Sequence, residues 1–290
     1  MRDQTAEWHR LKMRVVITGS SSGIGKIVAG KLRENGHEVW GLARRRQARL
    51  RLQRPEATCG YLRSSVCDVS KWASVRKAAL AIDKEWGGID ALITCAARQG
   101  VIGPTVTLDP GEWSETVRVT LDGTLNSIVG FFPLLRKSPQ RAKVICFSGG
   151  GATSPRPNFS AYAAAKAGVV RLVETLAEEW RDFQIDINAV APGALPTQMT
   201  AEILALGPEA AGSKEYAMAE KTTSAGFESF EKICALIAFL LSSQSDGING
   251  RLISAPWDSW QNLGPRKVDL AGSDVFTLRR ITPQDRGMTF

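Results

Sequence analysis

The sequence predicts an α/β protein, with a doubly wound parallel sheet in a single domain followed by a C-terminal extension. A short apolar, β-branched run, Val15–Ile17, is followed by a glycine-rich turn and then by apolar residues at helical spacing. Further strand-like runs alternate with helical patterns, as in a parallel sheet covered on both faces. With 290 residues and 43% hydrophobic composition, the chain is long enough for one such domain with a sizeable core.

The first half of the chain is expected to open with a right-handed strand–helix–strand unit. The first strand and its helix span Arg14–Asn35, and Asn35-Gly36 is a helix stop signal. Glu38–Ala43 is the second strand, at the separation expected for such a unit. The later elements are predicted at Tyr61–Val69 (strand), Lys71–Glu85 (helix) and Ala91–Ala97 (strand).

The second half continues the alternation up to a polar tail. Pro192–Ala225, rich in Gly, Pro and Ala, is expected to be irregular, and such a segment in an α/β enzyme is often a lid. We interpret residues 1–13 as a lead, 14–257 as the domain and 258–290 as a tail. The other elements predicted are a connector and long helix over Thr107–Lys137, strand Lys143–Phe147, loop Ser148–Ser160, helix Ala161–Phe183, strand Ile185–Val190, helix Glu231–Leu241 and strand Gly250–Ser254.

The composition argues against several classes of protein and site. No apolar run approaches the ~20 residues that span a bilayer, and the polar N-terminus lacks a signal-peptide core. The five cysteines form no C-x-x-C pair, which favours free thiols in a reducing cytoplasm. Only two histidines are present, and no cluster has metal-ligand spacing. We therefore expect a cytoplasmic protein with no membrane contact and no metal site.

The net charge of +8 raises the question of a nucleic-acid partner. Six arginines between Arg44 and Arg54 form a dense basic patch. A patch that binds nucleic acid is usually interleaved with stacking aromatics or accompanied by a docking motif, and neither is visible. We therefore expect no nucleic-acid partner, and the patch is either a solvated basic face or a site for a phosphate group.

The glycine-rich turn has the composition of a phosphate cradle. Strand, turn and helix in this order present the unpaired N–H groups of a helix N-terminus, and the positive end of its dipole, to an anion. Gly19 can take the sharp turn, while Gly23 and Gly25 leave room for a pyrophosphate and for close helix packing. A flexible loop is the simpler alternative, so the motifs further along the chain decide between them.

A second motif, Tyr162-Ala-Ala-Ala-Lys166, lies in the predicted helix Ala161–Phe183. Residues four apart share one helix face, so the ammonium group is expected near the phenol. A nearby positive charge favours the phenolate and lowers the tyrosine pKa, which suits Tyr162 to exchange a proton with a carbonyl or alcohol near neutral pH. Such pairs occur in many long helices, so this one gains its meaning from the glycine motif upstream.

Together, Thr18-Gly19-x-x-x-Gly23-Ile24-Gly25 and Tyr162-x-x-x-Lys166 resemble the short-chain dehydrogenase/reductase family over roughly Arg14–Ser254. The glycine spacing differs from the G-x-G-x-x-G of most dinucleotide folds. The resemblance implies a Rossmann-like fold and hydride transfer between a nicotinamide cofactor and the carbonyl or secondary alcohol of a small molecule, sugar-like or biosynthetic. It also implies a homodimer or homotetramer formed through two long helices.

The resemblance implies a role for each matching residue. Tyr162 is the acid/base, and Lys166 binds the ribose hydroxyls of the nicotinamide and tunes Tyr162. Asp68 meets the adenine, Ala96 meets a ribose through its backbone, and Thr197 holds the carboxamide. The full set expected to bind the cofactor is Gly19, Ser21, Ser22, Gly23, Ile24, Gly25, Arg44, Arg45, Asp68, Val69, Ala96, Tyr162, Lys166, Pro192, Gly193, Leu195 and Thr197.

The chain departs from the family pattern in three places. Ala97 replaces the last glycine of N-N-A-G. The catalytic serine, which the family carries thirteen residues before the tyrosine, is Gly149 here. Ser148, one residue earlier, is the expected catalytic replacement, although it also suits the end of a strand. Thr120 stands where the family has a helix asparagine that orders a water molecule.

The end of the second strand predicts the cofactor. An acidic residue there binds a ribose 2′-hydroxyl and disfavours a 2′-phosphate. The sequence has Arg44 and Arg45 instead, which can clamp a phosphate with charge-assisted hydrogen bonds. NADP(H) is therefore favoured, and NAD(H) stays open.

Three alternatives to this oxidoreductase stay open. The three departures favour a cofactor-binding sensor or scaffold with little turnover, which the intact Tyr162–Lys166 pair opposes. An extended-type sugar-nucleotide epimerase or dehydratase fits that pair, but it fits the glycine spacing and the chain length less well. A nucleic-acid binder is the weakest of the three. Trp257 and Trp260 either line a substrate pocket or close a core or subunit contact.

Overall fold

The strands form one parallel sheet. In the computed structural model, which describes residues 12–45, 62–224 and 228–289, seven strands lie in the order β3-β2-β1-β4-β5-β6-β7. Every pairing is parallel, and the order reverses direction between β1 and β4, so the predicted doubly wound topology is confirmed. The strands are β1 (Arg14–Thr18), β2 (Glu38–Ala43), β3 (Leu62–Val66), β4 (Ala91–Thr94), β5 (Ala142–Phe147), β6 (Ile185–Ala191) and β7 (Leu252–Ser254).

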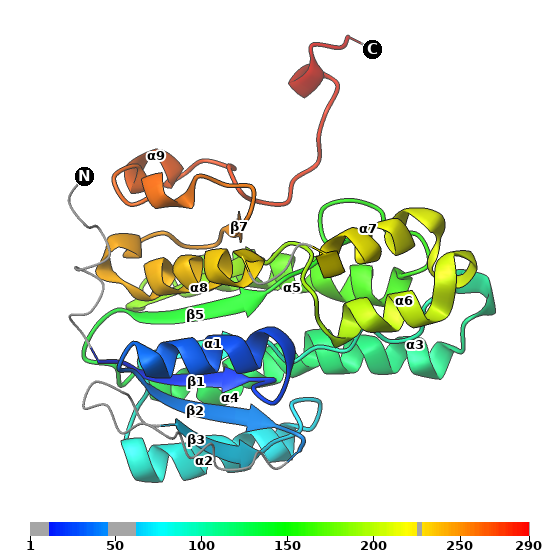
Figure 1. The fold of residues 1–290 in the computed structure, drawn as a ribbon. Helices are drawn as coiled ribbons and strands as arrows, with labels where there is room; N and C mark the ends of the chain where they lie inside the picture. Colours follow the sequence, from blue (N-terminus) through cyan, green and yellow to red (C-terminus); the bar gives the residue numbers. More distant parts are fainter. Residues whose placement is uncertain (1–11, 46–61, 225–227, 290) are drawn as a thin grey trace.

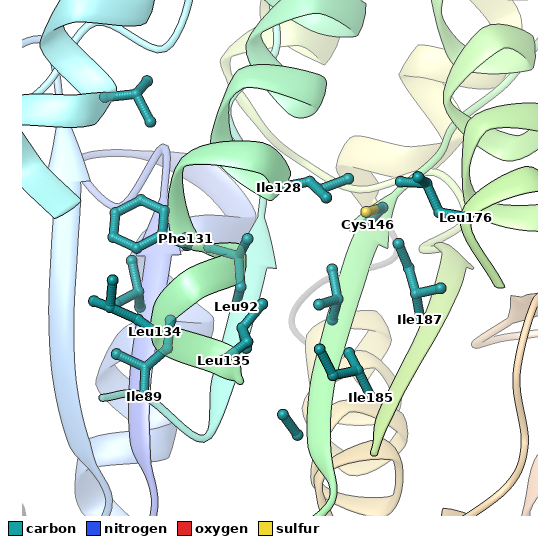
Figure 2. Close-up of a cluster of buried hydrophobic side chains, with 14 of the residues drawn as sticks. Ile89, Leu92, Ile128, Phe131, Leu134, Leu135, Cys146, Leu176, Ile185 and Ile187 are labelled. Carbon is teal, nitrogen blue, oxygen red and sulfur yellow. The ribbon is translucent and has the colours of Figure 1, made fainter. Parts of the chain in front are cut away.

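Helices cover both faces of the sheet, which explains why the inner strands are almost continuously apolar (Figure 1). One face packs against α1 (Gly23–Glu34) and α8 (Glu228–Leu241), and the other against α2 (Trp72–Trp86), α4 (Gly123–Leu135) and α5 (Ser160–Glu179). Figure 2 shows this second face, where Leu135 of α4 lies beside Leu92 of β4. The two apolar layers hold the strands together, so their carboxyl ends meet along one edge.

Three predicted elements end a few residues early, whereas β2 has the predicted bounds. β3, β4 and α5 end at Val66, Thr94 and Glu179. Beyond β4 the Ala96 N–H donates to the side chain of Thr18, at 3.2 Å, instead of continuing the ladder. The backbone after β4 therefore bonds to a side chain from a distant part of the sequence, which apolar content does not reveal.

The long helix expected within Thr107–Lys137 is present, with an interruption. It consists of α3 (Pro110–Val117), a π-helical turn over Arg118–Asp122 and α4, and a 3₁₀ turn at Thr105–Thr107 precedes it. A π turn holds an extra residue within a helix and is frequent at functional sites. Helical spacing alone cannot show such a local change.

The stretch expected to be irregular, Pro192–Ala225, contains two helices, so that prediction is wrong. α6 (Gln198–Ala211) and α7 (Ser213–Ser224) pack on each other beyond the carboxyl ends of the strands (Figure 1). Gly207, with a φ of 77°, and Pro208 kink α6, and Gly212 separates the two helices. These residues suggested a loop, but they mark only the joints between helical pieces.

The stretch expected to be a tail begins inside the core. Trp260, Leu263 and Leu270 are buried beside α8, and the Trp260 ring lies 5.7 Å from the ring of Phe239. They belong to a 3₁₀ turn at Trp260–Asn262 and to the short α9 (Lys267–Leu270). A boundary at 257/258 therefore does not separate two packing units. The last described residues, from Arg279 on, extend away from the body of the protein (Figure 1).

Some predictions fall on residues that the structure does not describe. The lead up to residue 11, Cys59 and the arginines from Arg46 to Arg54 are in this group. Across the described residues, the other four cysteines are free, and no group of three His, Cys, Asp or Glu side chains is placed to hold a metal ion. No helix of the described part is long and apolar enough to cross a membrane.

A buried ion cluster joins β5 and β6 at the amino ends of the strands. Lys143 Nζ lies 2.8 Å from Asp186 Oδ2, 2.7 Å from Asp246 Oδ1 and 3.2 Å from Ser245 Oγ. The side chains of Lys143 and Asp186 are almost fully buried. Asp186 also accepts from Arg141, at 3.1 Å. A buried pair of this kind costs much more to break than to form, because breaking it leaves an uncompensated charge.

Removing this lysine should destabilise the fold. In Lys143→Met, Asp186 stays buried with its charge only partly compensated by Arg141, and we expect a loss of roughly 3–5 kcal/mol in the free energy of unfolding. The matched control is Lys137→Met, which removes a solvent-exposed ion pair with Asp83 worth about 0–1 kcal/mol. Urea unfolding of both variants measures the difference, and equal losses would show that burial does not strengthen the cluster.

Candidate active site

The sequence motifs meet at the carboxyl ends of the strands. Gly19 follows β1 and Ala96 follows β4, on the two sides of the point where the strand order reverses. The hydrogen bond from the Ala96 N–H to Thr18 Oγ1 joins these two loops. Arg44 follows β2 and Ser148 follows β5 along the same edge. Ligands of open α/β sheets bind at this kind of crossover.

The glycine-rich turn requires its glycines. A Cβ on Gly19, whose φ is +70°, would lie 2.7 Å from the Ala96 backbone nitrogen, and a Cβ on Gly25 would lie 2.4 Å from the Gly19 carbonyl oxygen. Ser22 is the N-cap of α1, but its side chain makes no capping hydrogen bond, and the first turn has no acidic residue. The first N–H groups of α1 are therefore left to an external acceptor, which suits a phosphate.

The Pro192–Thr197 segment lies opposite this turn. A Cβ on Gly23 would find the Thr197 methyl group at 3.8 Å, so the two loops approach each other across the end of the sheet. Gly193 has a φ of +78°, and a Cβ there would lie 2.8 Å from Pro256. Leu195 is buried, and Thr197 is half-buried at the start of α6. The structure thus brings Thr197 of this segment close to the glycine turn.

The residues expected at the adenosine end lie after β2 and β3. Arg44 and Arg45 are exposed. Asp68 Oδ1 accepts from the Ser70 N–H at 3.1 Å and from its hydroxyl at 2.7 Å, so this carboxylate also organises the turn before α2. Val69 is buried, and a Cβ on Gly123 of α4 would lie 2.7 Å from it.

The first turns of α5 carry the candidate proton-transfer pair. Tyr162 and Lys166 are both almost fully buried, and Lys166 Nζ lies 5.7 Å from the centre of the Tyr162 ring. Lys166 Nζ donates to the carbonyl oxygen of Phe147, at the end of β5, at 2.6 Å. The indole N–H of Trp113 in α3 donates to Ser160 Oγ at 3.1 Å and so holds the beginning of α5. The expected shared face of the two residues is confirmed.

Burial dominates the electrostatics of this pair. It raises the pKa of Tyr162, and the nearby Arg156 guanidinium acts against it by favouring the phenolate. Burial lowers the pKa of Lys166 to about 8, while the thiols of Cys95 and Cys146 act in the opposite direction. The positive neighbour that favours the phenolate of Tyr162 is therefore Arg156 and not Lys166. The expectation that the lysine lowers the tyrosine pKa is wrong, because burial outweighs the nearby charge.

Gly149 is the residue whose α-carbon faces the phenol. A Cβ on Gly149 would lie 2.6 Å from the Tyr162 hydroxyl oxygen, so any side chain there crowds the phenol. Ser148 is buried, and its Oγ has no hydrogen-bond partner among the residues that the structure describes. Its expected catalytic role stays a prediction, since it does not contact Tyr162 through a hydrogen bond.

Thr120, in place of the family asparagine, braces the loop after β4. Its Oγ1 accepts from the Arg98 N–H at 3.2 Å and lies 3.3 Å from the Arg98 carbonyl oxygen, to which it donates. Thr120 is buried within the π-helical turn. The hydroxyl is thus engaged with the chain segment that begins at Ala96 and Ala97.

Three polar residues that the sequence analysis missed connect the site to α6 and α7. Gln99 Nε2 donates to the Met199 carbonyl at 3.3 Å, and Asn158 Nδ2 donates to the Ala210 carbonyl at 3.2 Å. Arg156 forms an ion pair with Glu215 of α7. No motif spacing marks these contacts, because each joins residues from distant parts of the chain.

Comparison with known proteins gives a consistent result. The family model for short chain dehydrogenases matches residues 13–205. A probable 2,4-dienoyl-CoA reductase from Bacillus subtilis is 32% identical over 88% of this chain and 99% of its own. Levodione reductase from Leifsonia aquatica is 30% identical over 86% of this chain and 93% of its own. A crystal structure of levodione reductase matches with a TM-score of 0.71 at 27% identity, over 87% of this chain and 98% of that one. With the family model covering well over half of its length, the chain belongs to the short-chain dehydrogenase/reductase family.

Proposed function

We propose that the protein is an NADP(H)-dependent oxidoreductase that moves a hydride between the nicotinamide and the carbonyl or secondary alcohol of a small molecule. Family membership makes it an NAD(P)-dependent dehydrogenase or reductase. The observation that carries the finer proposal is the buried pair at the head of α5, a phenol with an ammonium 5.7 Å from its ring centre. This pair lies at the strand edge where the glycine turn and the Pro192–Thr197 segment meet.

The residues present fit a dinucleotide. The turn from Gly19 to Gly25 has no room for side chains at its two ends, and it leaves backbone N–H groups for a pyrophosphate. Asp68 and Val69 would hold the adenine side, and Leu195 and Thr197 the nicotinamide side. The remaining contacts proposed are those of Ser21, Ser22, Gly23, Ile24, Ala96, Pro192 and Gly193. When bound, the cofactor supplies or accepts the hydride.

Tyr162 exchanges the proton. Its hydroxyl gives its proton to the carbonyl oxygen during reduction, and its phenolate takes the proton of the alcohol during oxidation. Lys166 would bind the ribose hydroxyls of the cofactor, with its Nζ oriented by the carbonyl oxygen of Phe147. Ser148, the hydroxyl at the end of β5, is proposed to donate to the substrate oxygen.

The substrate is proposed only as a small carbonyl compound or alcohol, sugar-like or biosynthetic. The two relatives above are named for levodione and for a 2,4-dienoyl-CoA, which differ chemically, so they indicate the reaction better than the substrate. A cofactor-binding sensor or scaffold is the second candidate, and Gly149 favours it, because no hydroxyl stands where the family has its serine. We propose a homodimer or homotetramer through α4 and α5. Leu125 and Val129 of α4 are exposed.

Replacing the proposed acid/base should separate turnover from binding. We expect Tyr162→Phe to bind NADPH as the wild type does and to lose turnover by about 10²- to 10⁴-fold, the usual contribution of a positioned acid/base. Fluorescence titration with NADPH and reduction of a carbonyl panel headed by levodione measure the two properties. Ser148→Ala in the same assays tests the second hydroxyl. Turnover that survives Tyr162→Phe would contradict the proposal, and cofactor binding without turnover in the wild type would favour the sensor.

The arginines after β2 should set the cofactor preference. Arg44→Glu with Arg45→Glu removes two donors to a 2′-phosphate and adds repulsion. We expect NADPH affinity to fall on the order of tenfold to a hundredfold, with NADH affinity nearly unchanged. Parallel titrations with NADPH and NADH measure this, and Arg280→Glu with Arg286→Glu, on two exposed residues of the C-terminal segment, makes the same change in net charge. Equal losses for both cofactors would contradict the assignment.

A further inference from the structure

Arg156 occupies an unusual position in the loop after β5. Its guanidinium carbon lies 3.9 Å from the centre of the Phe159 ring and 5.7 Å from that of Tyr162. Nε and Nη2 donate to one carboxylate oxygen of Glu215 at 3.0 and 2.8 Å. The two side chains are only 14% and 23% exposed, so solvent screens the pair weakly. The pair joins α7 directly to the neighbourhood of the phenol.

The same loop attaches the α6–α7 pair to the head of α5. Asn158 adopts a φ of +67° and donates to the carbonyl at the end of α6. Phe159, the residue before α5, is buried in a small apolar cluster with Ile203 and Ala211 of α6 and Ala219 of α7. Tyr162 follows one turn later. The position of α6 and α7 is therefore connected mechanically to the residue that exchanges the proton.

The charged and titratable groups around the phenol come from α5, α7, β5 and the loops after β4 and β5. Lys166 lies one turn along α5, with its Nζ engaged by the Phe147 carbonyl of β5. Arg156 approaches from the loop, and Glu215 from α7 stands behind it. The thiols of Cys95 and Cys146 are close enough to Lys166 to influence its pKa. From the loop after β5, the backbone of Gly149 also lies next to the hydroxyl of Tyr162. Arg156 is thus the charge whose neutralisation depends on α7.

We propose that Arg156 is a positioning residue for the reaction: its guanidinium stabilises the ionised form of Tyr162, and Glu215 sets how much of that positive charge the phenol experiences. The inference rests on the proposed role of Tyr162 in proton exchange. It gives α6 and α7 a chemical consequence, because any displacement of α7 that moves Glu215 away from Arg156 strengthens the positive field at the phenol. Arg156 then favours the ionisation of Tyr162, and Glu215 opposes it.

The ionisation of Tyr162 can be read without any substrate. The chain has three tyrosines, so protein labelled with [¹³Cζ]tyrosine gives three resonances that Tyr→Phe variants assign. We expect the Tyr162 titration midpoint to move to higher pH in Arg156→Met, because a stabilising charge is lost, and to lower pH in Glu215→Gln, because the guanidinium is no longer neutralised. Arg156→Lys keeps the charge and should stay near the wild type. A merely structural role would make it resemble Arg156→Met.

The control is Arg181→Met, which removes an exposed ion pair with Glu178 at the far end of α5 and should leave the midpoint unchanged. An unmoved midpoint in Arg156→Met, or a shift of the same sign in Glu215→Gln, would overturn the inference. If Arg156→Met does not fold, the sign of the Glu215→Gln shift decides. The proposed function fails separately: the midpoints then move as expected while no carbonyl is reduced. If the protein reduces a carbonyl but the Tyr162 midpoints do not move, the proposed function stands and the inference about Arg156 is wrong.

Discussion

The site depends on the burial of two ionisable side chains at the head of one helix. Tyr162 and Lys166 are both removed from water, which disfavours the charged form of each. Nearby polar groups partly offset the free-energy cost of this burial. The Phe147 carbonyl receives the ammonium, and the Arg156 guanidinium stands near the phenol. Burial keeps the phenol protonated, and the guanidinium favours the phenolate that forms when Tyr162 gives up its proton away from bulk water.

The sheet separates this chemistry from the groups that maintain the fold. Lys143 and Lys166 are similarly buried lysines near opposite ends of the strands, Lys143 in β5 and Lys166 in α5. Lys143 is surrounded by the carboxylates of Asp186 and Asp246 at the amino ends of the strands, where it serves stability. Lys166 has a neutral carbonyl and a phenol instead, at the carboxyl ends. The same residue type therefore has a structural or a functional role according to the charge of its partners.

Local motifs were predictable from the sequence, and long-range contacts were not. Short sequence spacings were enough to predict three features. These are the bounds of β2, the glycine turn, and the helix face that Tyr162 and Lys166 share. Helices α6 and α7 were missed because Gly207 and Pro208 resemble loop residues, although they only bend a helix. Arg156 was missed because its partner Glu215 is fifty-nine residues away along the chain. The position of Gly149 beside the phenol could not be predicted either, because sequence spacing does not show which α-carbon faces the hydroxyl.

The most direct test of this account follows the hydride itself. The protein is incubated with NADPH carrying deuterium at both positions of nicotinamide C4 and with levodione or another carbonyl compound that it reduces, and the product is analysed by mass spectrometry. The account predicts an alcohol with one deuterium on the former carbonyl carbon. A product without deuterium at that carbon, or a bound cofactor that never transfers its label to any carbonyl of the panel, would contradict the assignment of this site to hydride transfer.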